Sequence, residues 1–357
     1  MRKALSYILP LIAAFFCLIP PIDFALKAPD KNLWPLTMVC AAFLGIRMLF
    51  VRTNWIVRLA PTVLLINCFL SGMPVVSFNA YPPLLACAYF YVALTRMETW
   101  RPTWQMLGSL LVLNSLLLLM QVLGHDRLLN FGRQTIEGYG VIGQHMQMGS
   151  FSVILSAVLG ATTPLFYIFA IVVGIYCKSS WTLLCAGLAL AAAPGIRRPK
   201  ILGILAVLAL AGFFIMATKT GKFSANTHKD NGRSTVWMQS IEMSNERPIR
   251  GWGISTYQWA GPVFVKVKGI PWKQTHNDWI QLDVELGHPI FFLFVMAWAW
   301  VLAVLISKSA DPQIFKLTIG YLVISLDMVV HFPLRIIQCA PLIIIFLAYC
   351  EKKIRET

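Results

Sequence analysis

Charged residues are scarce in this sequence and make up only 13% of its 357 residues. A typical soluble globular domain contains about 25% charged residues. Hydrophobic residues make up 58% of the chain, and an apolar surface of that extent must be covered by something other than water. The composition therefore excludes an ordinary soluble protein and predicts an integral membrane protein.

The sequence also lacks the patterns of disulfide and metal chemistry. All eight cysteines lie inside or at the edge of apolar segments, and no Cys-x-x-Cys pair occurs. Structural disulfides are therefore not expected. His-Glu-x-x-His is absent, and His276 and His288 are not at metal-ligand spacing. We predict no metal site.

Acidic residues are half as frequent as basic ones, 15 against 30. A nucleic-acid-binding protein would gather such positive charge on one exposed face. Here Lys and Arg are scattered between apolar segments, which is typical of the charges that set membrane topology. We expect membrane lipids as partners and no nucleic acid.

Apolar segments of membrane-spanning length recur along the chain, so the expected fold is all-α, with about twelve transmembrane helices in a single membrane domain, 1–357. The predicted spans are 5–22, 34–51, 55–72, 80–95, 103–123, 149–162, 163–177, 180–193, 200–217, 288–307, 313–331 and 336–350. No small-residue cleavage site follows residues 5–22, which favours a first span over a signal peptide. Residues 160–164 are predicted either as a turn between two helices or as a kink in one.

Basic residues are concentrated in alternate short connections, which sets the orientation. With a cytoplasmic N-terminus, the cytoplasmic connections contain Arg47, Arg52, Arg58, Arg96, Arg101, Arg197, Arg198, Lys200 and Lys308. The short outer connections contain only Lys27, Lys31, Lys178 and Arg335. Both termini are then cytoplasmic, and two long polar loops lie on the outer face: 124–148, and 218–287 between spans nine and ten.

The loop 218–287 holds most of the reactive side chains, with nine basic and six acidic residues. Its basic surplus favours an anionic ligand, since Arg donates in pairs to phosphate; a solvated loop that pairs its own charges is the alternative. Arg233 precedes a helix-compatible run that Ser234 or Thr235 is expected to cap. A helix N-terminus at that point also favours an anion.

Two further motifs follow in the same loop. Arg250-Gly251-Trp252-Gly253 predicts a tight turn, with Trp252 and Trp259 either as a sugar platform or as anchors at the membrane interface. Thr275-His276-Asn277-Asp278 opens a short predicted helix capped by Thr275 or Asn277. His276 then precedes the helix, where a neutral imidazole is a usable general base near pH 7. A structural histidine is the alternative.

The loop 124–148 contains Gly138, Gly140 and Gly143 in a Gly-x-Gly-x-x-Gly pattern. No strand precedes this pattern, so it does not predict a dinucleotide site. A flexible loop whose backbone approaches a ligand is the better interpretation. Arg133 and His145 are candidate ligand contacts.

The order of these pieces resembles the O-antigen ligase and polymerase family of bacterial envelope glycosyltransferases. The resembling motifs are Gly232-Arg233-x-x-x-Trp237, Pro248-Ile249-x-Gly251-Trp252-Gly253, His276-Asn277-Asp278, Glu285-x-Gly287 and Asp327-x-x-x-His331-Phe332-Pro333, together with residues 138–149. The resemblance implies transfer of a glycan from an undecaprenyl-diphosphate carrier on the periplasmic face of the bacterial inner membrane. It further implies that neither metal nor cofactor takes part.

The resemblance also assigns roles to residues. His276 is expected to be the catalytic base, and Arg233, Arg250, Lys219 and Lys222 to bind the diphosphate. The family commonly has a Ser-Arg pair after span nine, where this chain has Thr218-Lys219-Thr220-Gly221-Lys222, so a lysine point charge replaces the paired donors of Arg. The secondary candidates are Asp278, Glu285, Arg133, His145, His331 and Arg335.

Three functions are compatible with these observations. Ligation of O-antigen to the lipid A core is expected first, and polymerisation of lipid-linked O-antigen or exopolysaccharide units is the alternative. A lipid-linked glycan transporter would have ionisable residues or broken helices at mid-membrane, whereas Asp327 is the only acid well inside a predicted span. A non-enzymatic partner of envelope assembly is a further class.

Overall fold

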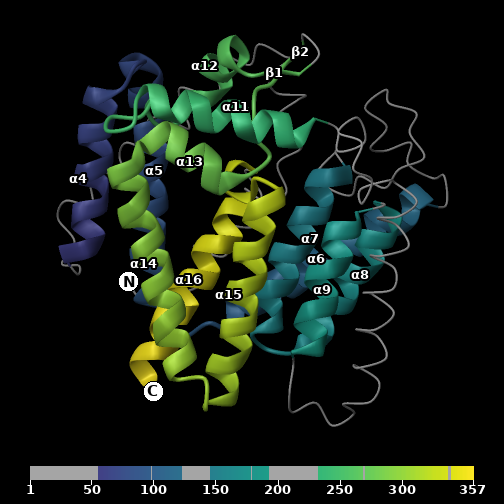
Figure 1. Cartoon of the computed structure of the whole chain (residues 1–357). Coiled ribbons are helices and arrows are strands. Elements are labelled where there is room, and N and C mark those ends of the chain that lie inside the picture. The colour runs from purple at the N-terminus through teal and green to yellow at the C-terminus, as the bar shows by residue number, and fades with distance from the viewer. Residues whose placement is uncertain are drawn as a thin grey trace, which may run out of the picture. The chain divides into compact units, whose positions relative to one another are not determined.

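The structure is a computed structural model, and it describes residues 55–97, 99–122, 145–177, 179–192, 232–267, 270–336 and 339–357. These residues are mostly helical, as expected for an all-α chain, and the sheet among them is one antiparallel pair of short strands (Figure 1). The predicted spans 5–22, 34–51 and 200–217 lie outside the described residues.

The other predicted spans correspond to helices. They are α4 (Trp55–Leu70), α5 (Pro74–Thr95), α6 (Arg101–Val122), α7 (His145–Gly160), α8 (Tyr167–Tyr176), α9 (Ser180–Ala191), α14 (His288–Ser307), α15 (Pro312–Val330) and α16 (Cys339–Glu356). Residues 160–164 form a turn that leads into the 3₁₀ helix η2 (Pro164–Phe166), so α7 and α8 are separate helices. α5 begins at Pro74, earlier than predicted, because proline suits the first helical position.

By length and composition, α14 and α15 are the described helices that are long and apolar enough to cross a bilayer. The apolar stretch of α14 is only 6% buried by the rest of the protein, whereas that of α15 is 50% buried. A long apolar helix with so little protein cover needs lipid or another apolar partner. The count of twelve spans stays a prediction.

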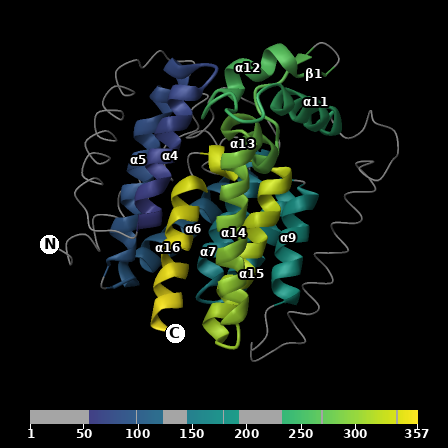
Figure 2. The same ribbon diagram turned by 60° about the vertical axis from the view of Figure 1, so that its left-hand side comes forward.

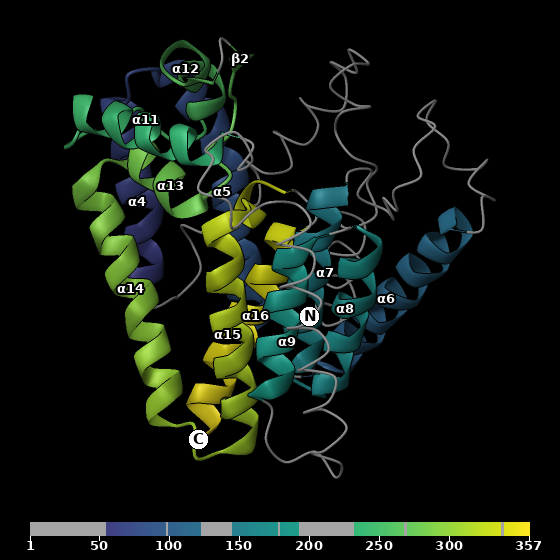
Figure 3. The ribbon, with the colours of Figure 1, turned by 45° about the vertical axis from the view of Figure 1, so that its right-hand side comes forward.

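The described helices fall into two compact units. The first contains the described residues between 94 and 192 together with 302–357, and the second contains 55–93 and 232–301. In the first unit α7 packs against α6, α8, α9, α15 and α16 (Figure 3). Residues 148–160 of α7 are buried on every side, so α7 is the central helix of this unit.

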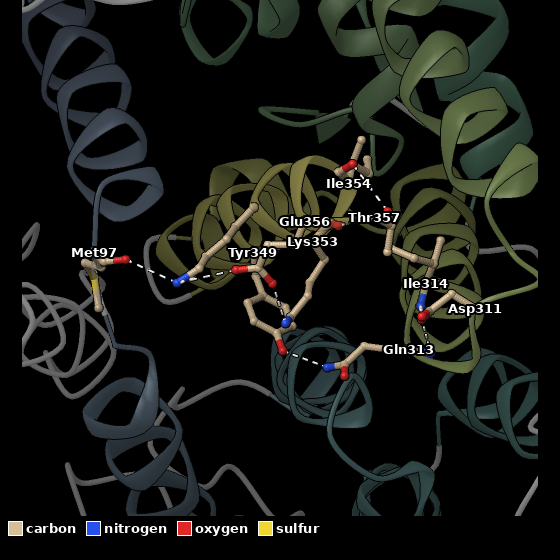
Figure 4. A network of polar contacts seen from close by, with 10 residues as sticks. Met97, Asp311, Gln313, Ile314, Tyr349, Lys353, Ile354, Glu356 and Thr357 are labelled. Atoms are coloured by element: carbon tan, nitrogen blue, oxygen red, sulfur yellow. Dashed lines mark hydrogen bonds and ion pairs between the residues drawn. The ribbon is translucent and has the colours of Figure 1, made fainter.

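Polar contacts fix the C-terminal end of α16 within the first unit (Figure 4). The Lys352 Nζ donates to the backbone oxygen of Met97 at 3.2 Å, and the Gln313 Nε2 donates to the Tyr349 hydroxyl at 2.7 Å. The Asp311 carboxylate accepts from two backbone N–H groups at the start of α15 and so caps that helix. These contacts join α16 to the start of α15 and to the backbone of Met97.

In the second unit the long polar insertion folds into a small domain with a core of its own. Its elements are α11 (Arg233–Glu246), α12 (Tyr257–Phe264), β1 (Lys266–Val267), β2 (Ile270–Pro271) and α13 (Asp278–Leu286). Figures 1 and 2 show α12 and the strands on the far side of α11 from α14. The buried apolar core consists of Val236, Met243, Trp252, Tyr257, Ala260, Val265 and Val284.

Two hydrogen bonds show that α11 and α13 run side by side in the same direction. Trp237, one turn into α11, donates its indole N–H to the backbone oxygen of Thr275 just before α13, at 2.9 Å. Ser244, in the last turn of α11, donates its hydroxyl to Asp283 Oδ2 in the second half of α13, at 2.8 Å. The two helix N-termini therefore lie at one end of the pair and the two C-termini at the other.

Candidate functional site

Arg233 is the first residue of α11, as the sequence predicted, but the expected cap by Ser234 or Thr235 is wrong. The cap is Gly232, whose φ of 77° is left-handed and whose carbonyl accepts from the Val236 N–H at 3.0 Å. A Cβ at Gly232 would come within 2.5 Å of a methyl group of Val267. Because glycine has no side chain to accept hydrogen bonds, the cap residue itself makes no side-chain bond to the first turn of α11.

His276 lies directly before α13, also as predicted, and its backbone is left-handed with a φ of 54°. A non-glycine residue in that region costs roughly 1–2 kcal/mol, so the surrounding structure must hold it there. The buried Thr275 does so with its hydroxyl, which donates to the Asn277 carbonyl at 2.6 Å and accepts the Asn277 N–H at 3.1 Å. The imidazole is left partly exposed.

Two further contacts orient this histidine. The predicted cap of α13 is confirmed, since the Asn277 Oδ1 accepts the Ile280 N–H at 3.1 Å. The Trp272 ring meets the His276 ring edge-to-face, with centroids 5.3 Å apart and an interplanar angle of 76°. His276 thus lies between a capped helix and an aromatic ring, and both restrict its movement.

Trp237 connects the two motifs. Residues four apart on a helix share a face and lie roughly 6 Å apart, so Arg233 and Trp237 occupy one face of α11. Trp237 in turn donates to the residue that precedes His276. The structure therefore brings the Arg233 and His276 motifs to the same end of the α11–α13 pair, where two helix N-termini add positive potential.

Of the two acidic candidates in this unit, Glu285 has a clear structural part. Its buried carboxylate accepts from the Ser255 N–H at 2.9 Å and from the Gln281 Nε2 at 3.2 Å, which fastens α13 to the segment entering α12. Asp278 is buried at the first position of α13, where the helix dipole favours a carboxylate.

Tyr257, at the start of α12, faces the same carboxylate. Burial raises the pKa of Tyr257 to about 12, with a smaller rise from the charge of Glu285, while the hydrogen bond with Ser240 opposes the rise. The Tyr257 hydroxyl and the Ser240 hydroxyl are 2.7 Å apart. The tyrosine therefore stays neutral in the core of the insertion.

Arg250 is exposed and lies at the other end of the pair from Arg233. α11 separates them with its 14 residues, which corresponds to about 20 Å of helix. The backbone oxygen of Arg250 accepts from the Asn67 Nδ2 of α4 at 3.1 Å. The structure does not bring the two arginines together.

The turn Gly251-Trp252-Gly253 is bound to the end of α13. The Trp252 and Gly253 N–H groups donate to the carbonyls of Val284 and Glu285 at 2.9 and 2.8 Å. A Cβ at Gly251 would collide with the backbone of Glu285. Trp252 is buried and donates its Nε1–H to a backbone oxygen of α11, so the expected sugar platform or interfacial anchor is wrong for this residue. Trp259 is 59% exposed.

The connection between α4 and α5 holds this turn from the other side, which the sequence did not indicate. The Asn67 Nδ2 lies 3.3 Å from the Leu286 oxygen as well as 3.1 Å from that of Arg250. The Ser71 hydroxyl donates to the Trp252 oxygen at 2.6 Å and accepts from the Ser77 hydroxyl at 2.8 Å. The polar residues Asn67 and Ser71 inside the predicted span 55–72 were the one sequence feature that could have indicated this contact, since polar side chains in a span usually have a partner.

In the first unit, Asp327 is the centre of a buried polar group. Its Oδ1 lies 2.7 Å from the His331 Nδ1, and its Oδ2 accepts from the Ser150 hydroxyl of α7. All three residues are buried, and their bonds fasten α7 to the end of α15. Arg335 ends the short helix η3 (Pro333–Arg335) and is partly exposed.

The remaining candidates are not placed by the structure. Arg133, Lys219 and Lys222 lie outside the described residues. His145 is the first residue of α7, but its side chain is not among those described. The role expected of Lys219 and Lys222, binding the diphosphate in place of the family's Arg, therefore stays a prediction.

Residues 148–295 match the family model described as O-antigen ligase. A comparison with curated proteins gives no match. The matched segment contains α11, α12 and α13, with Arg233 and His276, and it indicates a ligase-like or polymerase-like function on lipid-linked glycans. The resemblance predicted from the motifs is confirmed: over residues 148–295 this chain matches the O-antigen ligase family, whose members are membrane proteins.

Proposed function

We propose that this protein transfers a glycan from an undecaprenyl-diphosphate carrier to an acceptor sugar on the periplasmic face of the bacterial inner membrane. Ligation to the lipid A core is the first form of this proposal, and polymerisation of lipid-linked units is the second. One observation supports the proposal most. The Arg233 motif and the His276 motif lie at the same end of the helix pair, where α11 and α13 both begin.

Arg233 and the end of α11 are suited to the diphosphate of the donor. A guanidinium donates two parallel hydrogen bonds to phosphate oxygens, and the N-terminus of a helix adds backbone N–H groups and a positive dipole. Lys219 and Lys222 precede Gly232 in the chain and are proposed as further cations for the same diphosphate. Arg250 is left out of this site because it lies at the other end of α11.

The reaction requires one bond to form and one to break. The oxygen of an acceptor hydroxyl attacks the anomeric carbon of the donor sugar, its proton passes to the His276 imidazole, and the bond from that carbon to the diphosphate oxygen breaks. Undecaprenyl diphosphate leaves with the electron pair. Arg233 stabilises the negative charge that develops on it, which is the largest single contribution expected of such a site.

The test is complementation of a deletion strain with Arg233→Ala and His276→Ala. We expect each variant to insert into the membrane and to lower glycan transfer by about 10²–10⁴-fold, the usual contribution of a general base or a charge-stabilising donor. Lys273→Ala, an exposed change in the same insertion, is the control and should retain transfer. Normal surface glycan in both site variants would refute the proposal.

The same strain separates the two forms of the proposal. Loss of a ligase leaves free polymer on its lipid carrier, because the chain is built but not attached. Loss of a polymerase leaves single repeat units attached to the lipid A core. Analysis of the lipid-linked and the lipopolysaccharide fractions by gel electrophoresis distinguishes these products.

A further inference from the structure

The turn formed by Arg247, Pro248, Ile249 and Arg250 lies against the start of α14. The His288 N–H donates to the Pro248 oxygen at 2.7 Å. A Cβ at Gly287 would come within 2.7 Å of the Ile249 oxygen, so the two backbones are in direct contact. α14 is long and apolar enough to cross a bilayer, and a helix that crosses one places the residues at its start near the membrane surface.

The surface around the turn is apolar on one side and basic on the other. Ile249 is 72% exposed, and the first half of α14 continues with exposed apolar side chains, namely Phe292, Leu293 and Met296. Arg247 and Arg250 flank Ile249 and are both exposed. Basic residues beside an apolar surface at the end of a membrane helix are typical of the headgroup region of a bilayer.

Arg247 is held in a fixed position although it is exposed. Its guanidinium carbon lies 4.6 Å from the centre of the buried Trp252 ring, a cation–π contact. The guanidinium also lies against Gly72, where a Cβ would come within 2.5 Å of one of its nitrogens. Stacking of this kind orients the fork before a ligand arrives.

Neither arginine of this turn has an acidic partner among the described residues, whose ion pairs join other side chains. Two guanidinium groups three residues apart thus carry uncompensated charge beside an apolar surface. A planar fork suits a phosphate group, and an anionic leaflet attracts basic residues near the membrane. The complementary ligand has a negatively charged phosphate on one end and hydrocarbon on the other.

We propose that Arg247 and Arg250 bind the phosphate of an anionic phospholipid whose acyl chains lie against Ile249 and the first turns of α14. This lipid site is separate from the proposed glycan-transfer site, because α11 places it about 20 Å away from Arg233. Bilayer phospholipid is the chosen occupant because the apolar surface of α14 continues directly from the turn.

The test is native mass spectrometry of the full chain in detergent, titrated with phosphatidylglycerol or phosphatidylcholine. We expect preferential binding of phosphatidylglycerol, weakened about fivefold by each loss of an arginine charge. The double variant Arg247→Gln/Arg250→Gln should therefore lose most of the bound lipid. Arg247→Lys should weaken binding as well, because it keeps the charge but not the stacked fork.

Matched variants keep the proposal open to refutation. Lys266→Gln/Lys273→Gln removes the same charge from exposed lysines of the same insertion and should leave lipid binding unchanged. Arg250→Gln alone keeps the Arg247–Trp252 contact, so it tests the site if the double variant fails to fold. Equal losses in the two double variants would overturn the proposal. Displacement of phosphatidylglycerol by millimolar inorganic phosphate would overturn it too, since free phosphate would then be the ligand.

Discussion

At the scale of single residues, His276 has a left-handed backbone that its neighbours impose. The sequence predicted its place before a helix and a cap at Thr275 or Asn277, of which Asn277 is the one observed, since polar residues before an apolar run are a local pattern. It did not predict the left-handed conformation, because that depends on Thr275 and on the bond from Trp237 of another helix. The same limit explains Trp252, whose burial is decided by distant segments.

The first prediction concerns the strain at His276. Both His276→Gly and His276→Ala should lower glycan transfer to the same extent, about 10²–10⁴-fold, because each removes the imidazole. The glycine variant should nevertheless be more stable than the alanine variant by about 1 kcal/mol, since only glycine adopts a positive φ without cost. Thermal unfolding of the purified variants in one detergent measures the difference. Equal stability would show that the left-handed conformation is not strained.

A second prediction follows from the raised pKa of Tyr257, about 12 against an ordinary value of 10.0. The folded state holds the phenol proton more tightly than the unfolded state does. Its contribution to stability is therefore complete below pH 10 and is lost as the pH rises from 10 to about 12. Between these pH values the free energy of unfolding should therefore fall less steeply with pH for Tyr257→Phe than for the wild type. Parallel curves would contradict the assignment.

At the scale of elements, the turn at residues 250–253 is hydrogen-bonded to the end of α13 and to the end of α4 and the α4–α5 connection. We call this set of contacts the interlock of the insertion. The helix bounds were largely predictable, because apolar runs and caps are local signals. The interlock was not, since residues 67–77 and 250–287 are far apart in the sequence. The expectation of a tight turn was right, but its glycines serve close contact between backbones as well as the turn itself.

The third prediction compares two glycines. Gly251→Ala places a methyl group against the backbone of Glu285 and Gly287 at a φ of 64°, so it should destabilise the protein by about 2 kcal/mol or more. Gly108 lies in α6 with nothing within 4 Å of its added Cβ. Gly108→Ala should be neutral or stabilise by about 0.5–1 kcal/mol. The unfolding temperatures of the two variants and the wild type test this prediction. A Gly251→Ala variant as stable as the wild type would refute the interlock.

The fourth prediction concerns Asn67, the residue of α4 that donates to the carbonyls of Arg250 and Leu286. Asn67→Ala leaves the buried carbonyl of Leu286 and the partly buried carbonyl of Arg250 without this donor, which should cost about 1–3 kcal/mol. Ser109→Ala is the control, because among the described residues the Ser109 hydroxyl bonds within its own helix, to the Gln105 oxygen. A comparison of the two unfolding temperatures tests the contact, and equal values would contradict it.

At the scale of the whole molecule, the composition predicted an all-α membrane protein, and the motifs predicted the match of residues 148–295 to the O-antigen ligase family. The sequence also placed Arg233, Arg250 and His276 in one long insertion, but it could not arrange them there. The parallel packing of α11 and α13 brings the first and last of these motifs together and leaves Arg250 at the far end. That arrangement is why we propose two separate phosphate-binding regions, one for the donor and one for phospholipid.

The most direct test of the central claim is glycan transfer by the purified protein in vesicles, with an undecaprenyl-diphosphate-linked glycan and an acceptor. The measured quantity is the release of undecaprenyl diphosphate together with the elongated acceptor. Wild type and Lys273→Gln should form both products, and Arg233→Ala and His276→Gly, correctly inserted, should form neither. Equal product from the wild type and the two site variants would contradict the assignment of the reaction to the N-terminal end of α11 and α13.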